Sequence, residues 1–279
     1  MIVDVWMQHP TERHSAHEMF ASLRRWTKAT PRPAIITPEM TIAAMDGGGV
    51  SLGLTAAWCA PDGWMISNDE VAAIARAYPD RILGVASVPL HKPMEAVREL
   101  RRAVKTLGFR ALRIVPWLWN LPPTDRRYYP LYAECIDLGI PFCTQVGHTG
   151  PLRPSETGRP IPYIDEVALE FPELRIIAGH IGYPWTQEMI AVATKHENVY
   201  IDTSAYTAKR YPRELVEYMQ GHGRGKVMFG TNYPMITAAK ALEHLDQLGL
   251  DSEAKELFLG GNAARVFDLK RRPLTSACN

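Results

Sequence analysis

The chain has 279 residues, 46% of them hydrophobic, and its 31 basic and 30 acidic residues leave a formal net charge of +1. This length matches one α/β barrel, which typically needs about 250 residues, and the balanced charge argues against a partner that is nucleic acid or an anionic membrane. The four cysteines form no CxxC pair and no apolar run approaches a membrane span, so we expect a soluble, unprocessed, cytoplasmic protein.

Short β-branched apolar runs alternate with helix-period segments along the whole chain. This alternation is typical of parallel strands joined by helical crossovers. The runs predicted as strands are 2–5, 51–57, 82–87, 111–115, 142–146, 175–178, 199–202 and 227–230. Eight parallel strands bury both faces and favour closure, so we predict an α/β fold, a single (β/α)8 TIM barrel domain over 1–279.

A long insertion, residues 7–36, follows the first predicted strand. It contains His9, His14, His17 and Trp26 together with several prolines. Its apolar and aromatic content predicts an ordered, extended loop cap over the barrel mouth. The histidine spacing is loop-like and lacks an adjacent acidic ligand, so these histidines are interpreted as cap or surface residues rather than as a metal site.

Residues at the carboxyl ends of the strands are the candidates for function, because the loops after the strands carry the active site in such barrels. Several separated motifs occur in chain order along the sequence, over residues 3–10, 138–142, 177–185, 198–204, 230–234 and 258–267. They resemble the amidohydrolase barrels of the branch that includes aminocarboxymuconate-semialdehyde decarboxylase and several aromatic-acid decarboxylases. The resemblance covers nearly the whole chain.

The resemblance also implies where a metal would be bound in this family. The corresponding positions here are Trp6, Gln8, Gln145, His180 and Asn232. A neutral amide is a weak ligand and indole is none, and asparagine cannot accept a proton as a general base. We therefore predict replaced metal ligands and no cofactor. The alternative is a divalent metal such as zinc, held through His180 and His148 after a local slip in register.

The remaining side chains can still bind and transform a small polar molecule. His180 is the best-placed group that titrates near neutrality, and the guanidinium of Arg113 suits a carboxylate. Two alternatives remain open: Arg113 as a core arginine paired with an acid such as Asp202, and His148 as a strand terminus only. The predicted catalytic residues are His180, Asp202 and His148, and the predicted substrate-binding residues are Trp6, Gln8, Arg113, Gln145, Trp185, Asn232 and Tyr233.

Three functions are compatible with these residues. The preferred hypothesis is an amidohydrolase-fold hydrolase acting on a small, carboxylated cyclic compound, lactone or ester by a metal-independent mechanism. The first alternative is a decarboxylase, that is a carboxy-lyase, of a small aromatic or unsaturated acid. The second is a non-catalytic binding protein with a retained pocket. In each case we expect a small-molecule partner, neither nucleic acid nor membrane, and leave homo-oligomerisation open.

Overall fold

Eight parallel strands form the centre of the computed structural model, which describes residues 1–26 and 35–269. Each predicted run overlaps one of these strands, because strands buried on both faces consist of nearly continuous apolar residues. They are β1 (Ile2–Met7), β2 (Val50–Ala56), β5 (Ile82–Val85), β6 (Leu112–Ile114), β7 (Phe142–Gln145), β8 (Ile176–Gly179), β9 (Val199–Asp202) and β10 (Val227–Met228).

The strands close into a barrel. They pair in the orders β1-β2-β5 and β10-β9-β8-β7-β6, with parallel register throughout. A bridge between Ala86 and Leu112 joins β5 to β6. The backbone N–H of Val5 donates to the carbonyl of Phe229 at 3.0 Å, which joins β1 to the end of β10. The predicted TIM barrel is confirmed.

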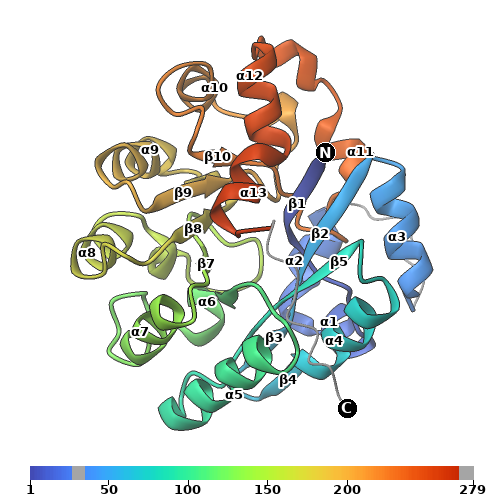
Figure 1. The fold of residues 1–279 in the computed structure, drawn as a ribbon, viewed down its shortest axis with the longest axis vertical. Helices are drawn as coiled ribbons and strands as arrows, with labels where there is room; N and C mark the ends of the chain where they lie inside the picture. Colours follow the sequence, from blue (N-terminus) through green and yellow to red (C-terminus); the bar gives the residue numbers. More distant parts are fainter. Residues whose placement is uncertain (27–34, 270–279) are drawn as a thin grey trace.

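Helices surround the strands, as Figure 1 shows. The helix α5 illustrates why they pack there: its buried residues Ala96, Val97, Leu100 and Ala103 recur at helical spacing and form one apolar face. The helices of the ring and their extensions are α3 (Pro38–Asp46), α4 (Asn68–Ala77), α5 (Pro93–Lys105), α6 (Pro116–Trp119), α7 (Tyr129–Asp137), α8 (Tyr163–Glu170), α9 (Thr186–Lys195), α10 (Arg213–Gln220), α11 (Ala238–Leu242), α12 (Ser252–Glu256) and α13 (Asn262–Val266).

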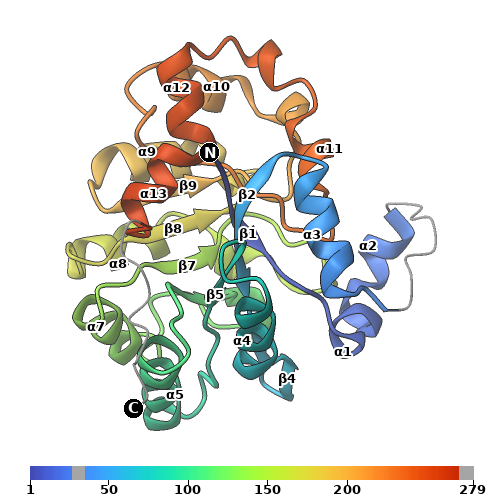
Figure 2. The same ribbon diagram turned by 45° about the vertical axis from the view of Figure 1, so that its right-hand side comes forward.

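Two additional elements stand at the carboxyl end of the barrel. The insertion after β1 forms α1 (Glu12–Ala16), a short 3₁₀ turn η1 (Glu18–Phe20) and α2 (Ala21–Trp26), which lie beside α3 in Figure 2. Residues 27–34 of the predicted cap lie outside the described ranges. The sequence did not predict the antiparallel hairpin of β3 (Trp58–Ala60) and β4 (Gly63–Ile66) that follows β2.

Within residues 1–26 and 35–269, no helix is both long enough and apolar enough to cross a bilayer.

Candidate active site

A cavity of about 1460 Å³ opens where the barrel strands end. Its floor comes from strand ends, and its walls come from the cap, the hairpin and α6. The floor residues are Trp6, Gln8, Gln145, His148, His180 and Asn232, and the aromatic wall residues include His14, Phe20, Trp58, Trp117 and Tyr206. The structure therefore brings together six of the residues that the sequence placed at the site.

His180 occupies the centre of the floor, directly after β8. Its backbone lies in the left-handed region with φ 73°, a conformation that is costly for a residue with a Cβ and that clusters at functional sites. Its Nδ1 lies 2.7 Å from Ser204 Oγ, its Nε2 lies 3.4 Å from Asn232 Nδ2, and its ring packs edge-on against Trp6. Burial lowers the pKa of His180 to about 3, and the charge of Arg113 acts in the same direction.

The floor amides hold one another in fixed orientations. Gln8 accepts from Arg113 at 3.0 Å through Oε1 and donates from Nε2 to Asn232 Oδ1 at 3.1 Å. Because Asn232 Oδ1 is the acceptor, its Nδ2 faces the imidazole of His180 as a donor. The Nε2 of His180 is then unprotonated, and its Nδ1–H donates to Ser204. The floor thus presents a neutral imidazole of defined tautomer.

Gln145 is fixed from the other side of the floor. Its Oε1 accepts from the indole N–H of Trp117 at 2.7 Å, while its Nε2 lies 3.4 Å from the carbonyl of His148. The His148 backbone N–H donates to the carbonyl of Tyr183 at 2.6 Å, so the loop after β7 is tied to the loop after β8. The His148 side chain lines the cavity and its ring packs edge-on against Tyr183, with 6.3 Å between the ring centres.

Arg113, predicted to bind substrate, lies beneath the cavity floor. Its side chain is 3% exposed, lies in the barrel interior and is absent from the cavity lining among the described residues. The guanidinium stacks 4.6 Å from the ring centre of Trp6 and 5.5 Å from that of Trp58, and it donates to Gln8. Burial lowers the pKa of Arg113 to about 9. It supports the floor from beneath, because Gln8 and Trp6 lie between it and the cavity.

Asp202 is also beneath the floor. A Cβ added to Gly179 or to Gly230 would come within 2.8 Å of its carboxylate, so both glycines are needed for this close approach. Its Oδ1 accepts from the Ser204 backbone N–H at 2.7 Å, and its Oδ2 has no hydrogen-bond partner in the described part of the chain. Burial raises the pKa of Asp202 to about 7. It touches Ser204 rather than the cavity.

Two further predicted residues lie off the described cavity lining. Trp185 packs with Arg159, whose guanidinium carbon is 5.7 Å from its ring centre. Tyr233 takes part through its backbone carbonyl, which accepts from Gln8. Conversely, the sequence argument missed Trp58 and Tyr206. Trp58 follows β2 closely, so the rule that strand ends form the site contained the signal for it.

Basic side chains gather at the mouth of the cavity. Arg24, Lys209, Arg210 and Lys240 line it, against the acids Glu12 and Glu243. Lys240 forms an ion pair with Glu243, and Arg24 donates to the carbonyls of Ser15 and His17. The mouth is therefore more positive than the nearly neutral chain as a whole. Such a mouth attracts anions.

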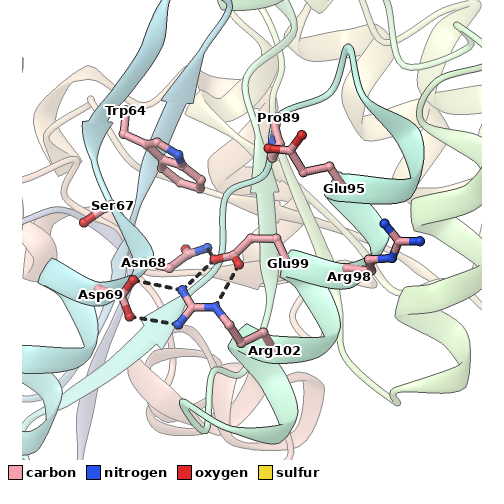
Figure 3. Close-up of a pocket in the computed structure, with 9 residues that line it drawn as sticks. All are labelled: Trp64, Ser67, Asn68, Asp69, Pro89, Glu95, Arg98, Glu99 and Arg102. Carbon is pink, nitrogen blue, oxygen red and sulfur yellow. Dashed lines mark hydrogen bonds and ion pairs between the residues drawn. The ribbon is translucent and has the colours of Figure 1, made fainter.

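A second hollow, of about 470 Å³, lies on the flank of the barrel between α4 and α5 and is drawn in Figure 3. Arg102 spans it and donates to both Asp69 and Glu99. Glu99 also accepts from Asn68 at 2.7 Å. These charges satisfy one another, so the hollow has the character of a structural ion-pair network rather than of a reactive site.

Most side chains that line the main cavity differ from the usual ligands of a transition metal. Among the described residues, no group of three or more His, Cys, Asp or Glu side chains is placed to hold a metal ion. Transition metals are usually bound by imidazole, thiolate or carboxylate groups. The imidazoles of His148 and His180 both line the cavity, and the other floor side chains are amides or indole.

The chain is similar in sequence to a known protein family and to named decarboxylases. A family model described as Amidohydrolase matches residues 32–269. Gamma-resorcylate decarboxylase of Rhodococcus jostii (strain RHA1) is 28% identical over 257 residues, covering 74% of this chain and 76% of that protein.

Solved structures show the same barrel. An uncharacterised TIM-barrel protein from Bordetella bronchiseptica has a TM-score of 0.84 at 27% identity, covering 97% of this chain and 99% of that one. A dihydroxybenzoic acid decarboxylase from Polaromonas sp. JS666, with bound manganese and the inhibitor 2-nitroresorcinol, has a TM-score of 0.73 at 20% identity. That alignment covers 98% of this chain and 99% of the decarboxylase.

Proposed function

Because the chain belongs to the amidohydrolase family, we propose that it is a carboxy-lyase that removes carbon dioxide from a small aromatic acid. The observation that carries this proposal is the cavity, in which the central imidazole of His180 lies among aromatic walls behind a basic mouth. Aromatic walls suit a planar ring, and the basic mouth suits its carboxylate. The named decarboxylases among the similar proteins support this alternative over the hydrolase preferred from the sequence.

We assign the proton transfer to His180. In the free protein its imidazole is neutral, because burial lowers its pKa to about 3. A bound carboxylate would bring negative charge next to Nε2 and favour protonation there, so the imidazole would take up one proton from solvent and become an imidazolium. When the carbon–carbon bond breaks, its electron pair remains on the ring carbon and carbon dioxide leaves. The imidazolium then delivers its proton to that carbon.

The other floor residues would bind and orient the acid. The Nδ2 group of Asn232 and the Nε2 group of Gln145 are amide donors on the floor, and both can donate to carboxylate or hydroxyl oxygens. Ser204 holds His180 in one tautomer through its Nδ1. Arg113 positions Gln8 from beneath instead of touching the substrate. His148 lines the same cavity and is the reserve candidate for proton transfer.

We further propose that this reaction does not use the family metal. The positions that would hold it carry Trp6, Gln8, Gln145, His180 and Asn232, that is, one imidazole, three amides and an indole. The amides already bind Arg113, Trp117 and one another. A divalent ion would have to displace these bonds and accept weak ligands in return. The residues present therefore do not fit a tightly held zinc or manganese.

Hydrolysis of a lactone or ester remains a second candidate function. One observation favours it: a neutral His180 is the form that can accept a proton from water. The same amide donors could stabilise the oxyanion that forms when water attacks a carbonyl. This mechanism does not require a substrate carboxylate, so uncharged lactones and esters discriminate it from the carboxy-lyase.

The test is a substrate panel of hydroxybenzoates, lactones and esters, assayed with and without a chelator. We expect release of carbon dioxide from a hydroxybenzoate, equal rates in both conditions, and much less than one transition-metal ion per purified chain. Hydrolysis of a lactone without carbon dioxide release would favour the second function. Binding without turnover would indicate a non-catalytic protein. About one tightly held zinc or manganese per chain, with activity lost in chelator, would contradict the metal-independent mechanism.

A further inference from the structure

Three consecutive residues directly after β8 lie in the left-handed backbone region. They form the turn η3 (His180–Gly182), in which His180, Ile181 and Gly182 have φ angles of 73°, 53° and 77°. Glycine adopts this region readily, whereas a residue with a Cβ does so at a cost, and a β-branched residue such as Ile181 is a clear outlier there. Strain of this kind persists only where the surrounding structure enforces it, and it clusters at functional sites.

The side chain of Ile181 is the part of this turn that reaches the core. It is 0% exposed and belongs to the main hydrophobic core, although the residue before it lines the cavity. Full burial of a large aliphatic side chain is favourable by an amount similar to the cost of one left-handed residue. Because side-chain direction follows the backbone, relaxing the strain at Ile181 would disturb this burial.

The end of the turn is packed between two neighbouring elements. A Cβ added to Gly182 would come within 2.7 Å of the Cβ of Met189 on α9, and one added to Gly147 would come within 2.5 Å of the carbonyl oxygen of Tyr183. Gly147 belongs to the loop after β7, the strand beside β8 in Figure 1. These contacts fix the chain after the turn, and the buried side chain of Ile181 fixes its middle.

His180 stands at the start of the same turn, so the turn sets the direction of its side chain. The ring must place Nδ1 within hydrogen-bond distance of Ser204 Oγ, which is 2.7 Å away, and leave Nε2 to the cavity. A misplacement of about 1 Å in a reacting group can cost about a hundredfold in rate. A device that holds the backbone of His180 is therefore important for its chemistry.

We propose that Ile181 is a positioning residue, whose buried side chain holds η3 in its left-handed conformation and thereby aims the imidazole of His180. Among the described residues that line the cavity Ile181 is absent, so it acts through His180 and not on the ligand. This inference rests on the proposed function, which assigns proton transfer to His180. The orientation of the ring can nevertheless be measured without any turnover.

The first experiment is NMR of the ligand-free full chain with ¹⁵N-labelled histidine at pH 7. In wild type we expect one protonated and one unprotonated ring nitrogen for His180, identified by their absence from the His180→Ala spectrum. In Ile181→Ala the two resonances should move toward a common average, because a loosened ring exchanges between tautomers. Ile181→Val keeps the branched Cβ and most of the buried side chain, so it should retain the wild-type pattern.

The matched control is Ile176→Ala. Ile176 is also 0% exposed and lies at the opposite end of β8, so the substitution removes the same atoms from the same strand. We expect the wild-type pattern of His180 to remain in this variant. If Ile181→Ala does not fold, Ile181→Gly serves in its place, because glycine removes the side chain and the strain together. Its His180 resonances should be averaged in the same way.

The second experiment measures turnover of 2,6-dihydroxybenzoate. We expect kcat to fall about tenfold or more in Ile181→Ala or Ile181→Gly, with KM within twofold of wild type, and kcat to stay within twofold in Ile181→Val and Ile176→Ala. A wild-type His180 pattern in Ile181→Ala or Ile181→Gly, or an equal change in Ile176→Ala, would overturn the inference. Averaged resonances in the Ile181 variants, together with a wild type that releases no carbon dioxide, would contradict the proposed function and leave the inference intact.

Discussion

His180 connects the buried polar groups beneath the floor to the open cavity. Ser204 contacts its Nδ1, Asn232 faces its Nε2, and Asp202 lies behind Ser204. The proton on Nδ1 is therefore turned inward, and the lone pair on Nε2 is turned toward the substrate space. A histidine in this arrangement can exchange a proton with a bound substrate through Nε2 while its ring stays buried.

Replacing His180 by alanine tests that role. We expect turnover of the preferred substrate at saturation to fall about a hundredfold or more, because proton transfer by a positioned side chain typically contributes this much. The circular dichroism spectrum should remain native. The control His222→Ala removes an exposed imidazole from the end of α10. A fully active His180→Ala protein would contradict the assignment and shift it to His148.

The buried carboxyl of Asp202 predicts a dependence of stability on pH. Its pKa is raised from 3.8 to about 7 by burial, so the folded state binds the proton more tightly than the unfolded state does. The stability that this proton contributes is complete below about pH 4 and is lost as the pH rises toward 7. In Asp202→Asn the side chain no longer titrates, so this loss disappears.

The measurement is urea unfolding of wild type and Asp202→Asn between pH 4 and pH 8. The unfolding free energy of wild type minus that of the variant should decrease with pH, by no more than about 1.4 kcal/mol per pH unit for one proton. Asp80→Asn, which removes an exposed carboxylate, serves as the control. A difference that is constant, or that increases with pH, would show that the carboxyl is already ionised in the folded protein.

The start of α4 is stabilised by a capping box. Ser67 accepts from the backbone N–H of Glu70, and the Glu70 side chain accepts from the backbone of Ser67. Glu70 also forms an ion pair with Arg13 of α1. The start of α4 therefore holds the insertion after β1 against the hairpin side of the barrel. These contacts at the start of α4 are partly exposed and separate from the cavity floor.

Loss of this cap should reduce stability without changing chemistry. In Ser67→Ala we expect the unfolding free energy to fall by about 1 kcal/mol, the usual effect of losing such a side-chain acceptor. Turnover at saturation should remain unchanged. Ser51→Ala, at an exposed position of β2, should be nearly neutral in the same urea titration. An equal effect of the two substitutions would argue against a capping contribution.

The sequence predicted the repeating elements well and the depth of individual side chains less well. All eight barrel strands were predicted, because apolar β-branched runs are a direct consequence of burial on both faces. The hairpin after β2 was missed because Trp58–Ala60 continues the apolar run of β2 without a break. Arg113 was predicted at the cavity mouth because it stands at the carboxyl end of a strand. That position does not reveal which neighbouring side chains separate it from the cavity. Gln8 and Trp6 cover it, and only the folded arrangement shows this.

The whole molecule is nearly neutral, yet the mouth of its cavity is basic. Lys209 and Arg210 stand together on the 3₁₀ turn η4 (Ala208–Arg210), and both are exposed. Charges that are exposed to water act mainly on the approach of a substrate, because salt screens them and solvent weakens their contact energy. Their effect should therefore appear in association rather than in the chemical step.

Removal of both charges should slow capture of an acid. In the double variant Lys209→Ala/Arg210→Ala we expect kcat/KM to fall several-fold at low ionic strength, kcat to stay constant, and the salt dependence to weaken. The control Lys92→Ala/Arg98→Ala removes the same charge near α5, away from the mouth. An unchanged salt dependence in the mouth variant would mean that these cations do not guide the substrate.

The floor of the cavity and part of its wall come from separate parts of the chain. The groups assigned to chemistry stand on strand ends, which the barrel fixes, whereas His14 and Phe20 belong to one continuous insertion after β1. Exchanging that segment for the equivalent loop of a related barrel would leave His180 and its supports in place. An evolving or engineered protein of this kind could therefore acquire new substrates by changing this one insertion, without altering the residues that carry out the chemistry.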